Sequence, residues 1–201
     1  MALTFSKMAL EADHSYRKLM VPKEPLEKPP LSIRELGDDE LRCRAKRISK
    51  VDDGIRALAR DMLLTMYSSR GIGLAAPQVG VSKQLIVIDL DFEESACPPM
   101  VFINPEIKVT GATLDTYEEG CLSIPGVYLN VVRPSVVEVA YRDETGRPRR
   151  LKADGLLARC ILHELDHLNG VLFVDRVTDE LSLNEGLKEK GFNRSDVHTI
   201  R

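Results

Sequence analysis

The 201-residue chain contains no tryptophan, and aromatic residues make up only 5% of it. A chain with so few aromatic side chains offers little surface on which the bases of single-stranded nucleic acid can stack. The chain also has no basic excess, because 31 aspartate and glutamate residues outnumber 28 lysine and arginine residues. Proteins that bind nucleic-acid phosphates are normally rich in lysine and arginine. We therefore expect no specific recognition of nucleic acid.

Long apolar runs are absent as well. The longest ones, such as residues 85–88, fall far short of the roughly 20 residues that cross a bilayer, so we predict no membrane span. The four cysteines are not closely paired in the sequence, and acidic residues occur early in the N-terminal segment. These features favour a reducing compartment and argue against a secretory signal. We therefore expect a cytoplasmic protein.

The composition predicts one globular unit with extensions. Hydrophobic residues make up 43% and charged residues 29% of the chain, which is ordinary for a globular protein of one domain. Residues 1–30 contain four prolines and little periodicity, so we expect an extended arm. Residues 31–176 carry the globular pattern and are expected to form the main domain. Residues 177–201 read as a polar tail with at most one short helix.

Two predicted helices enclose a β-rich middle. Apolar residues from Ile55 to Tyr67 recur at helical spacing after Asp52 and Asp53, which predicts an amphipathic helix that ends near Gly71. A second helix is predicted over residues 154–168. Between the helices, short β-branched runs predict antiparallel strands at 85–90, 100–103, 107–110, 127–132 and 136–141, with a hairpin turn at 143–146. The expected fold class is α+β, with antiparallel sheets packed around the second helix.

The second helix contains the motif His163-Glu164-Leu165-Asp166-His167. Histidines at positions i and i+4 project from one helix face and suit two ligands of one metal ion. A helical projection places Glu164 within the apolar stripe, where an unpaired carboxylate costs several kcal/mol unless a partner or a catalytic role explains it. The same projection gives Asp166 a supporting or a surface role. A buried glutamate in a satisfied network beside two incidental histidines is the structural alternative.

The third metal ligand has candidates on both sides of this motif. Upstream, Cys121 lies in the segment EGCLS between predicted strands, and a thiolate is a strong ligand for a soft divalent ion. Downstream, Glu185 or Glu189 would complete the site of an HExxH endopeptidase, but both belong to the polar tail. We favour Cys121, with a small core cysteine as the alternative.

A glycine-rich segment, GIGLAAPQVG at residues 71–80, precedes both motifs. It is not a phosphate-binding loop, since no Lys-Ser or Lys-Thr follows it, and by itself it fits a linker equally well. Together, however, GIGLAAPQVG, EGCLS and HELDH in this order resemble the peptide deformylase family, hydrolases that remove the formyl group from nascent chains. The resemblance extends over residues 31–176. The stretch PGVYLNVVRP is similar to the cyanobacterial and plastid branch of the family.

The resemblance implies a catalytic site with one divalent ion, expected to be Fe2+, although Zn2+, Ni2+ or Co2+ can occupy such a site. The implied metal ligands are Cys121, His163 and His167. Glu164 would act as general base and then as general acid, while the Gln78 side-chain amide and the Leu122 backbone N–H would stabilise the oxyanion.

The resemblance also implies a partner, the N-formylmethionyl nascent peptide, which is met at the ribosome near its exit tunnel. The residues expected to bind the substrate are Ile72, Gly73, Gly120, Leu156 and Cys160. Leu156 and Cys160 would line the methionine pocket, whereas Arg159 has no assigned role. A deformylase-like domain that binds formyl peptides or the ribosome without turnover is the remaining alternative.

Overall fold

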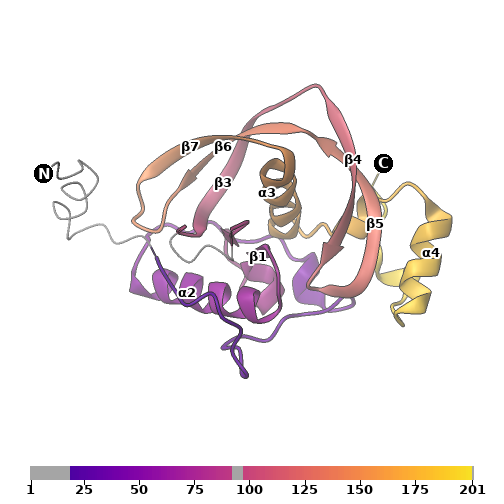
Figure 1. The fold of residues 1–201 in the computed structure, drawn as a ribbon, viewed down its shortest axis with the longest axis horizontal. Helices are drawn as coiled ribbons and strands as arrows, with labels where there is room; N and C mark the ends of the chain where they lie inside the picture. Colours follow the sequence, from indigo (N-terminus) through magenta and orange to yellow (C-terminus); the bar gives the residue numbers. More distant parts are fainter. Residues whose placement is uncertain (1–18, 92–96, 201) are drawn as a thin grey trace, which may run out of the picture.

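The computed structural model describes residues 19–91 and 97–200. In these residues the chain forms α-helices and antiparallel strands joined by short 3-10 helices (Figure 1). The α-helices are α2 (Asp53–Ser68), α3 (Gly155–Leu168) and α4 (Glu180–Glu189). The strands are β1 (Gly73–Ala75), β2 (Leu85–Ile88), β3 (Met100–Thr110), β4 (Leu114–Cys121), β5 (Ile124–Pro134), β6 (Val136–Arg142) and β7 (Pro148–Asp154). The predicted α+β class is confirmed.

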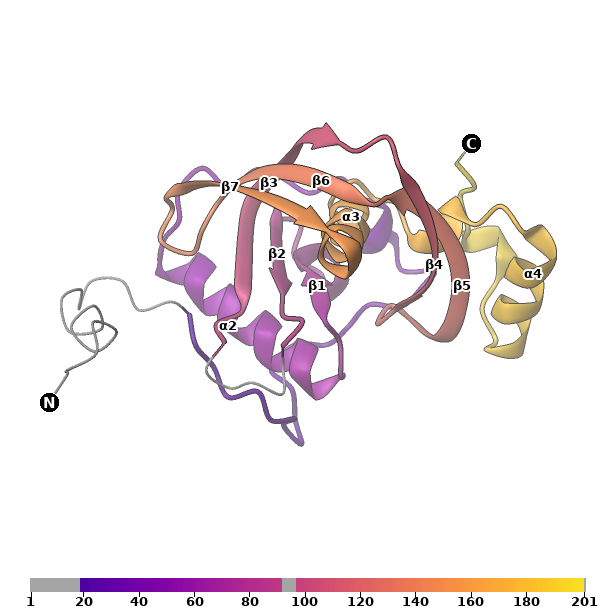
Figure 2. The ribbon, with the colours of Figure 1, turned by 45° about the horizontal axis from the view of Figure 1, so that its top comes forward.

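The strands form two separate layers. Five of them make one antiparallel sheet in the order β1-β2-β3-β6-β7, whereas β4 and β5 form a two-stranded ribbon. In β5 buried and exposed residues alternate from Val127 to Arg133, because only one face of the ribbon packs on the interior. Figure 2 shows the sheet and the ribbon on either side of α3. Within the described residues β1 and β4 are thus edge strands, and each leaves one backbone edge unpaired.

Helix α2 confirms the first predicted helix. It begins after Asp52, whose carboxylate accepts a hydrogen bond from the backbone N–H of Ile55 at 3.0 Å. It is closed by Gly71, whose N–H donates to the carbonyl of Met66. The apolar face of α2 packs against β1 and β2 and forms a large part of the first hydrophobic cluster. This packing fixes the glycine-rich segment that follows the helix.

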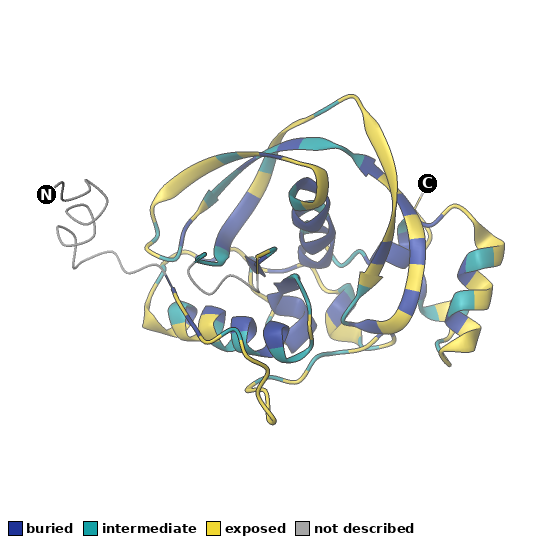
Figure 3. Cartoon of the chain, in the orientation of Figure 1, coloured by how far each residue is buried: buried dark blue, intermediate teal, exposed yellow. Residues whose placement is uncertain are grey.

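Helix α3 lies at the centre of the molecule and confirms the second predicted helix. Figure 3 shows it buried along most of its length, and it contacts β1, β2, β5, β6 and β7. The helix ends at Leu168 and is followed by Asn169 and by Gly170, which has a φ of +75°. A side chain at Gly170 would collide with the backbone of Arg42, so the glycine allows the chain to leave the helix under that segment.

Three strands have no counterpart in the sequence prediction, namely β1, β4 and β7. β1 lies inside the glycine-rich segment, and the exposed faces of β4 and β7 are strongly polar, which hides the alternation that marks a strand. The predicted strands 100–103 and 107–110 are one strand, β3. This strand is irregular near its middle. Asn104 has a left-handed φ of +52°, and the pairing with β6 shifts its register between Ile103 and Glu106.

Both ends of the described chain pack on the globular core. Residues 1–18 of the predicted arm lie outside the described residues, but Leu19 and Val21 are buried in the first hydrophobic cluster. In the predicted polar tail, Leu183 and Leu187 of α4 are buried against the β5 side of the ribbon. The two segments therefore contribute to the core more than their composition suggests. No helix in the described residues is long and apolar enough to cross a membrane.

Candidate active site

The three predicted metal ligands come together at one point. Cys121 is the last residue of β4, and His163 and His167 project from the same face of α3. One donor atom from each residue lies within 4.8 Å of the others, and Cys121 Sγ is 3.2 Å from His167 Nε2. In residues 19–91 and 97–200 no other group of three such side chains meets this spacing. A thiol and two imidazoles fit a divalent transition metal, with a further position left for another ligand.

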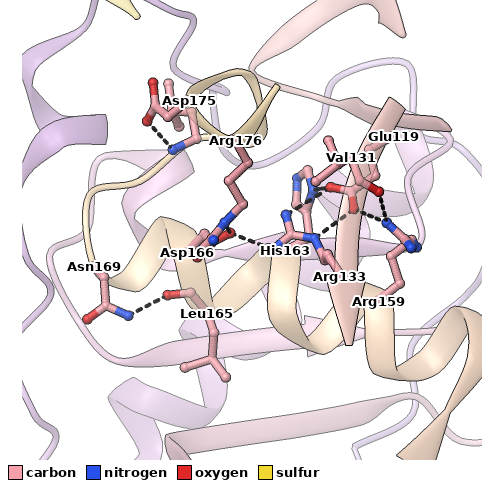
Figure 4. A network of polar contacts seen from close by, with 11 residues as sticks. Glu119, Val131, Arg133, Arg159, His163, Leu165, Asp166, Asn169, Asp175 and Arg176 are labelled. Carbon is pink, nitrogen blue, oxygen red and sulfur yellow. Dashed lines mark hydrogen bonds and ion pairs between the residues drawn. The ribbon is translucent and has the colours of Figure 1, made fainter. Parts of the chain in front are cut away.

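A buried carboxylate, Glu119, holds the first histidine in place. Its Oε2 accepts a hydrogen bond from His163 Nδ1 at 2.9 Å, which directs the other ring nitrogen toward Cys121. Its two oxygens also accept from Nε and Nη2 of Arg133 at 2.7 and 2.9 Å, and Oε1 accepts from Arg159 Nη1 at 2.7 Å. Figure 4 shows Glu119 between these three side chains. The histidine, two arginines and glutamate thus form one connected polar network.

The charges in this network set its protonation states. Burial alone would raise the pKa of Glu119, but the hydrogen bonds from His163 and Arg133 outweigh burial and hold that pKa far below its usual range. Burial alone would lower the pKa of His163, but its hydrogen bonds with Cys121 and Glu119 raise it to about 10. Burial and the neighbouring His163 lower the pKa of His167. Glu119 is therefore ionised across the physiological range.

Asp166 has the supporting role that the helical projection left open. Its Oδ2 accepts from Arg133 Nη1 at 2.6 Å, and its two oxygens accept from Arg176 Nε and Nη2 at 2.6 and 2.5 Å. The side chain is largely buried, and Arg176 connects it to the segment that follows α3. Asp166 thus fixes Arg133, which in turn holds Glu119.

Glu164 is buried next to the metal-ligand cluster, packs tightly against β1 and contributes to the lining of a cavity. Burial raises the pKa of its carboxyl to about 7. Its Oε2 is buried and has no hydrogen-bond partner among the described protein atoms. A Cβ atom at Gly73 would lie 2.5 Å from Glu164 Oε1 and 2.8 Å from Cys160 Sγ, so only glycine fits beside this carboxylate. An unpartnered carboxylate with a pKa near neutrality suits proton transfer.

Gln78 projects from the short 3-10 helix Ala76–Val79, directly after β1. Its Oε1 accepts from the backbone N–H of Ala75 at 2.8 Å, which fixes the direction of the amide. Its Nε2 donates to Ser123 Oγ at 3.2 Å and lies 3.5 Å from Cys121 Sγ. The donor end of the amide therefore points into the metal-ligand cluster, as the sequence motif predicts.

A cavity of about 730 Å³ opens onto this cluster. All of the residues predicted to bind the substrate line it, and so do both residues predicted to stabilise the oxyanion. These residues are Ile72, Gly73, Gln78, Gly120, Leu122, Leu156 and Cys160. The cavity lies between the edge strands β1 and β4. Glu185 and Glu189, the ligands expected of an HExxH endopeptidase, lie on α4 and are not part of the lining or of the cluster.

The sequence prediction missed Glu119, Arg133 and Ser123, and it left Arg159 without a role. Two of them carried a signal. Glu119 is two residues before Cys121 in β4 and therefore faces the same side as that ligand. Arg133 continues the buried alternation of Val127, Leu129 and Val131 in β5, a position where a charged residue needs a partner.

A thiol and two imidazoles beside an unpaired carboxylate are groups that metal-dependent hydrolases use to activate water. The model of the polypeptide deformylase family matches residues 30–182. The chain is 63% identical over 200 residues to a peptide deformylase from Synechococcus sp. (strain CC9605), with 100% of both chains covered. It is 64% identical over 197 residues to one from Prochlorococcus marinus (strain NATL2A), with 98% of each covered.

Solved structures agree with this assignment. A crystal structure of a peptide deformylase from Synechococcus elongatus in complex with actinonin has a TM-score of 0.89 and 62% identity, over 90% of this chain and 98% of that one. A plant peptide deformylase has a TM-score of 0.76 and 41% identity, over 83% and 90% of the two chains. The chain belongs to the peptide deformylase family, in its cyanobacterial branch. Its activity is the metal-dependent removal of the formyl group from the N-terminus of nascent peptides.

Proposed function

We propose that deformylation takes place in the cavity between β1 and β4, whose residues bind the metal, transfer the proton, stabilise the oxyanion and hold the substrate. The observation that carries this proposal is the meeting of three kinds of group at one end of the cavity. These are a donor set for a divalent metal, the unpartnered carboxylate of Glu164 and the fixed amide of Gln78. Each group supplies one requirement of amide hydrolysis.

The metal ligands are Cys121, His163 and His167, and we assign Fe2+ as the ion that works in the cell. Zn2+, Ni2+ and Co2+ suit the same three donors, so the ligand set alone does not separate them. A divalent ion held by these ligands would lower the pKa of water and so would make hydroxide available at neutral pH. Glu119 keeps His163 in the tautomer and orientation that a metal ligand requires.

Glu164 transfers the proton. It takes a proton from the attacking water and delivers it to the nitrogen of the departing peptide, so that formate and a free amino terminus result. Its raised pKa supports both steps, because a group with a pKa near the working pH can accept and release a proton with similar ease. Its position next to His163 in the sequence keeps it beside the metal ligands.

Gln78 and Leu122 stabilise the oxyanion that forms on the formyl group. The Gln78 amide is held by Ala75, so that its Nε2 is aimed before the substrate arrives. Leu122 follows Cys121 in the turn between β4 and β5 and lines the same cavity, which supports a role for its backbone N–H.

The substrate backbone binds between the two edge strands. Ile72 precedes β1, and Gly120 lies in β4 next to the metal-ligating cysteine, so an extended peptide can pair with both unpaired edges. Leu156 and Cys160 then line the pocket for the methionine side chain. The absence of a side chain at Gly73 lets β1 lie directly against Glu164 and Cys160, so that the substrate strand is held close to the carboxylate.

We further propose that the enzyme meets its substrate at the ribosome, near the exit tunnel, in the bacterial cytoplasm. A plastid location is the alternative if residues 1–30 include a targeting sequence. The expected substrate, a nascent peptide that still carries its formyl group, supports the ribosomal partner.

The decisive experiment is formate release from formyl-Met-Ala-Ser by protein purified without oxygen and with its metal quantified. We expect rapid release by the wild type and almost none by Glu164→Ala, which should still bind the metal. Glu185→Ala is the matched control on α4 and should keep both metal and activity. Release of no formate by fully metal-loaded wild type would overturn the proposal and favour a binding domain. Loss of metal from Glu185→Ala would favour the endopeptidase.

A further inference from the structure

Arg159 lies one helical turn before His163 on α3, and its guanidinium is fixed at three points. Nη1 donates to Glu119 Oε1 at 2.7 Å and to the carbonyl of Val131 at 3.0 Å. Nη2 donates to the carbonyl of Asp115 at 2.8 Å. Its side chain is only 9% exposed. An arginine held by one carboxylate and two strand carbonyls cannot easily change its position.

This guanidinium lies where two cavities meet. Beside the 730 Å³ cavity there is a second one of about 310 Å³, whose far wall includes Pro134 and Ser135. Tyr117, Leu156 and Arg159 line both cavities. The Arg159 guanidinium carbon is 5.7 Å from the centre of the Tyr117 ring, a distance at which a cation and an aromatic face attract each other. Arg159, Tyr117 and Leu156 together form the partition between the two cavities.

The first side chain of the substrate must point toward this partition. That side chain branches from the carbon bonded to the formamide nitrogen, so it leaves the peptide close to Glu164 and the metal ligands. Cys160 and Leu156 provide the apolar wall at this place, and Arg159 comes next on the same part of α3. A side chain that enters between Leu156 and Cys160 therefore comes close to Arg159, which lines the same cavity.

We propose that Arg159 is a specificity-determining residue that closes the side-chain pocket and limits the length of the first side chain. The inference rests on the proposed function and deepens it, because it names the group that separates the substrate pocket from the side cavity. Removing the guanidinium joins the two cavities, so that a side chain longer than methionine can extend toward the apolar surfaces of Tyr117 and Pro134. Figure 4 shows how Glu119 holds Arg159 in this position.

The test compares two formyl peptides that differ only in the first side chain. One carries norleucine, whose linear side chain is as long as that of methionine, and the other carries 2-aminooctanoic acid, which is two methylenes longer. In Arg159→Ala the ratio of kcat/KM for the long substrate to kcat/KM for the short one should rise. A methylene that is fully buried in apolar surroundings is worth about fourfold, so two methylenes should raise the ratio by at most about fifteenfold.

Arg133→Lys is the matched control. Arg133 donates to the same Glu119 carboxylate but lines neither cavity. Its variant should lower kcat/KM for both substrates alike and leave their ratio unchanged. Arg159→Gln provides a second measurement if the alanine variant does not fold, since its shorter side chain keeps one donor for Glu119. Its ratio should rise in the same direction by a smaller factor.

A second substitution locates the added space. Ser135 lines only the side cavity, so a leucine there should fill the space that Arg159→Ala opens. The double variant Arg159→Ala with Ser135→Leu should therefore return the substrate ratio most of the way to the wild-type value. Failure of this reversal would show that the longer side chain binds elsewhere and would overturn the assignment of the side cavity.

Equal losses for both substrates in Arg159→Ala and Arg159→Gln would reduce Arg159 to a support for Glu119 and overturn the proposal. Failure of the proposed function itself is distinguishable, because it would appear as absent formate release from the norleucine peptide by the wild type. A normal wild-type rate with an unchanged ratio in both Arg159 variants rejects only the inference about Arg159.

Discussion

Glu119 and Glu164 are two buried carboxylates on either side of the same histidine, yet their surroundings differ in almost every respect. Glu119 accepts hydrogen bonds from two arginines and from His163. Glu164 packs against Gly73 and Cys160, and its Oε2 has no partner among the described protein atoms. Both side chains are at most 5% exposed, so burial alone does not explain the contrast.

The difference lies in which protonation state the surroundings favour. The cationic and hydrogen-bonded environment keeps the pKa of Glu119 far below its usual range, whereas burial without such partners raises the pKa of Glu164 to about 7. One carboxylate is therefore a permanent anion that orients a metal ligand. Glu164, in contrast, can gain or lose a proton near neutral pH. Two identical side chains acquire separate roles from their neighbours.

Replacing each carboxylate by its amide is the most direct test of the different roles of Glu119 and Glu164. Glu164→Gln should lower kcat by about 10²–10⁴, because general acid–base transfer is lost. Its metal content should stay near the wild-type value, since Glu164 is not a metal ligand. Its free energy of unfolding at neutral pH should equal or exceed that of the wild type, because the amide removes no hydrogen bond to Oε2 and avoids an ionised carboxylate at a buried site. Formate release, metal analysis and urea unfolding measure the three quantities.

Glu119→Gln should show the converse pattern. Metal affinity should fall about 10–100-fold, because His163 loses the acceptor that orients it. The free energy of unfolding should fall by about 3–5 kcal/mol, because Arg133 loses a buried counter-charge. If Glu119→Gln keeps its metal while Glu164→Gln loses it, the roles assigned to the two carboxylates are reversed.

Gln78→Ala removes a catalytic group that, unlike the two carboxylates, carries no charge. We expect kcat to fall by about 10²–10³, the usual effect of losing one oxyanion donor, with metal content unchanged. Ser123→Ala is the control, since it removes the acceptor for Gln78 Nε2 but keeps the amide fixed by Ala75. It should cost less than tenfold. Equal losses in both variants would assign the effect to the hydrogen bond with Ser123.

The sequence predicted the part of the site that is local in the chain. His163, Glu164 and His167 lie within one helical turn, so helical periodicity alone places them on neighbouring faces and puts Glu164 in the apolar stripe. The prediction that Cys121 joins them depended on the chemistry of thiolates and on the family resemblance. The structure brings all of these residues together.

The network around Glu119 could not be predicted in the same way. Its members come from β4, β5 and α3, and the partners of Glu119 are 14 to 44 residues away in the sequence. Such pairing depends on the register of β4 against β5 and on how the ribbon meets α3. β1 is equally difficult to predict, because three residues are too few for a periodic pattern. Leu183 and Leu187 provide too few apolar positions to reveal that α4 packs on the core.

Gly73→Ala tests the close packing that isolates Glu164. The new Cβ would lie 2.5 Å from Glu164 Oε1, so the carboxylate must move. A displacement of about 1 Å in a catalytic group costs about 10² in rate, and we expect a loss of that size in kcat with the metal retained. Gly186→Ala on α4 is the control, because its Cβ would meet only ordinary contacts, 3.6 Å or more away. Wild-type kcat in Gly73→Ala would show that Glu164 does not depend on this packing.

The dependence of stability on pH separates the two carboxylates with opposite signs. The folded-state pKa of Glu119 is below its ordinary value of 4.5, so its contribution is complete above that pH and is lost as the pH falls below it. The folded-state pKa of Glu164 is above its ordinary value, so the folded protein binds the extra proton between 4.5 and about 7. Stability from this group therefore declines as the pH rises through that interval.

Urea unfolding of the metal-free protein from pH 3 to pH 8 measures both effects. Glu164→Gln should abolish the decline between pH 4.5 and 7, while Glu119→Gln should flatten the loss of stability below pH 4.5. The slope due to one group is at most about 1.4 kcal/mol per pH unit, which makes this the smallest of the expected effects. A decline that persists in Glu164→Gln would mean that another group binds the proton, and Glu164 would then have no special suitability for proton transfer at neutral pH.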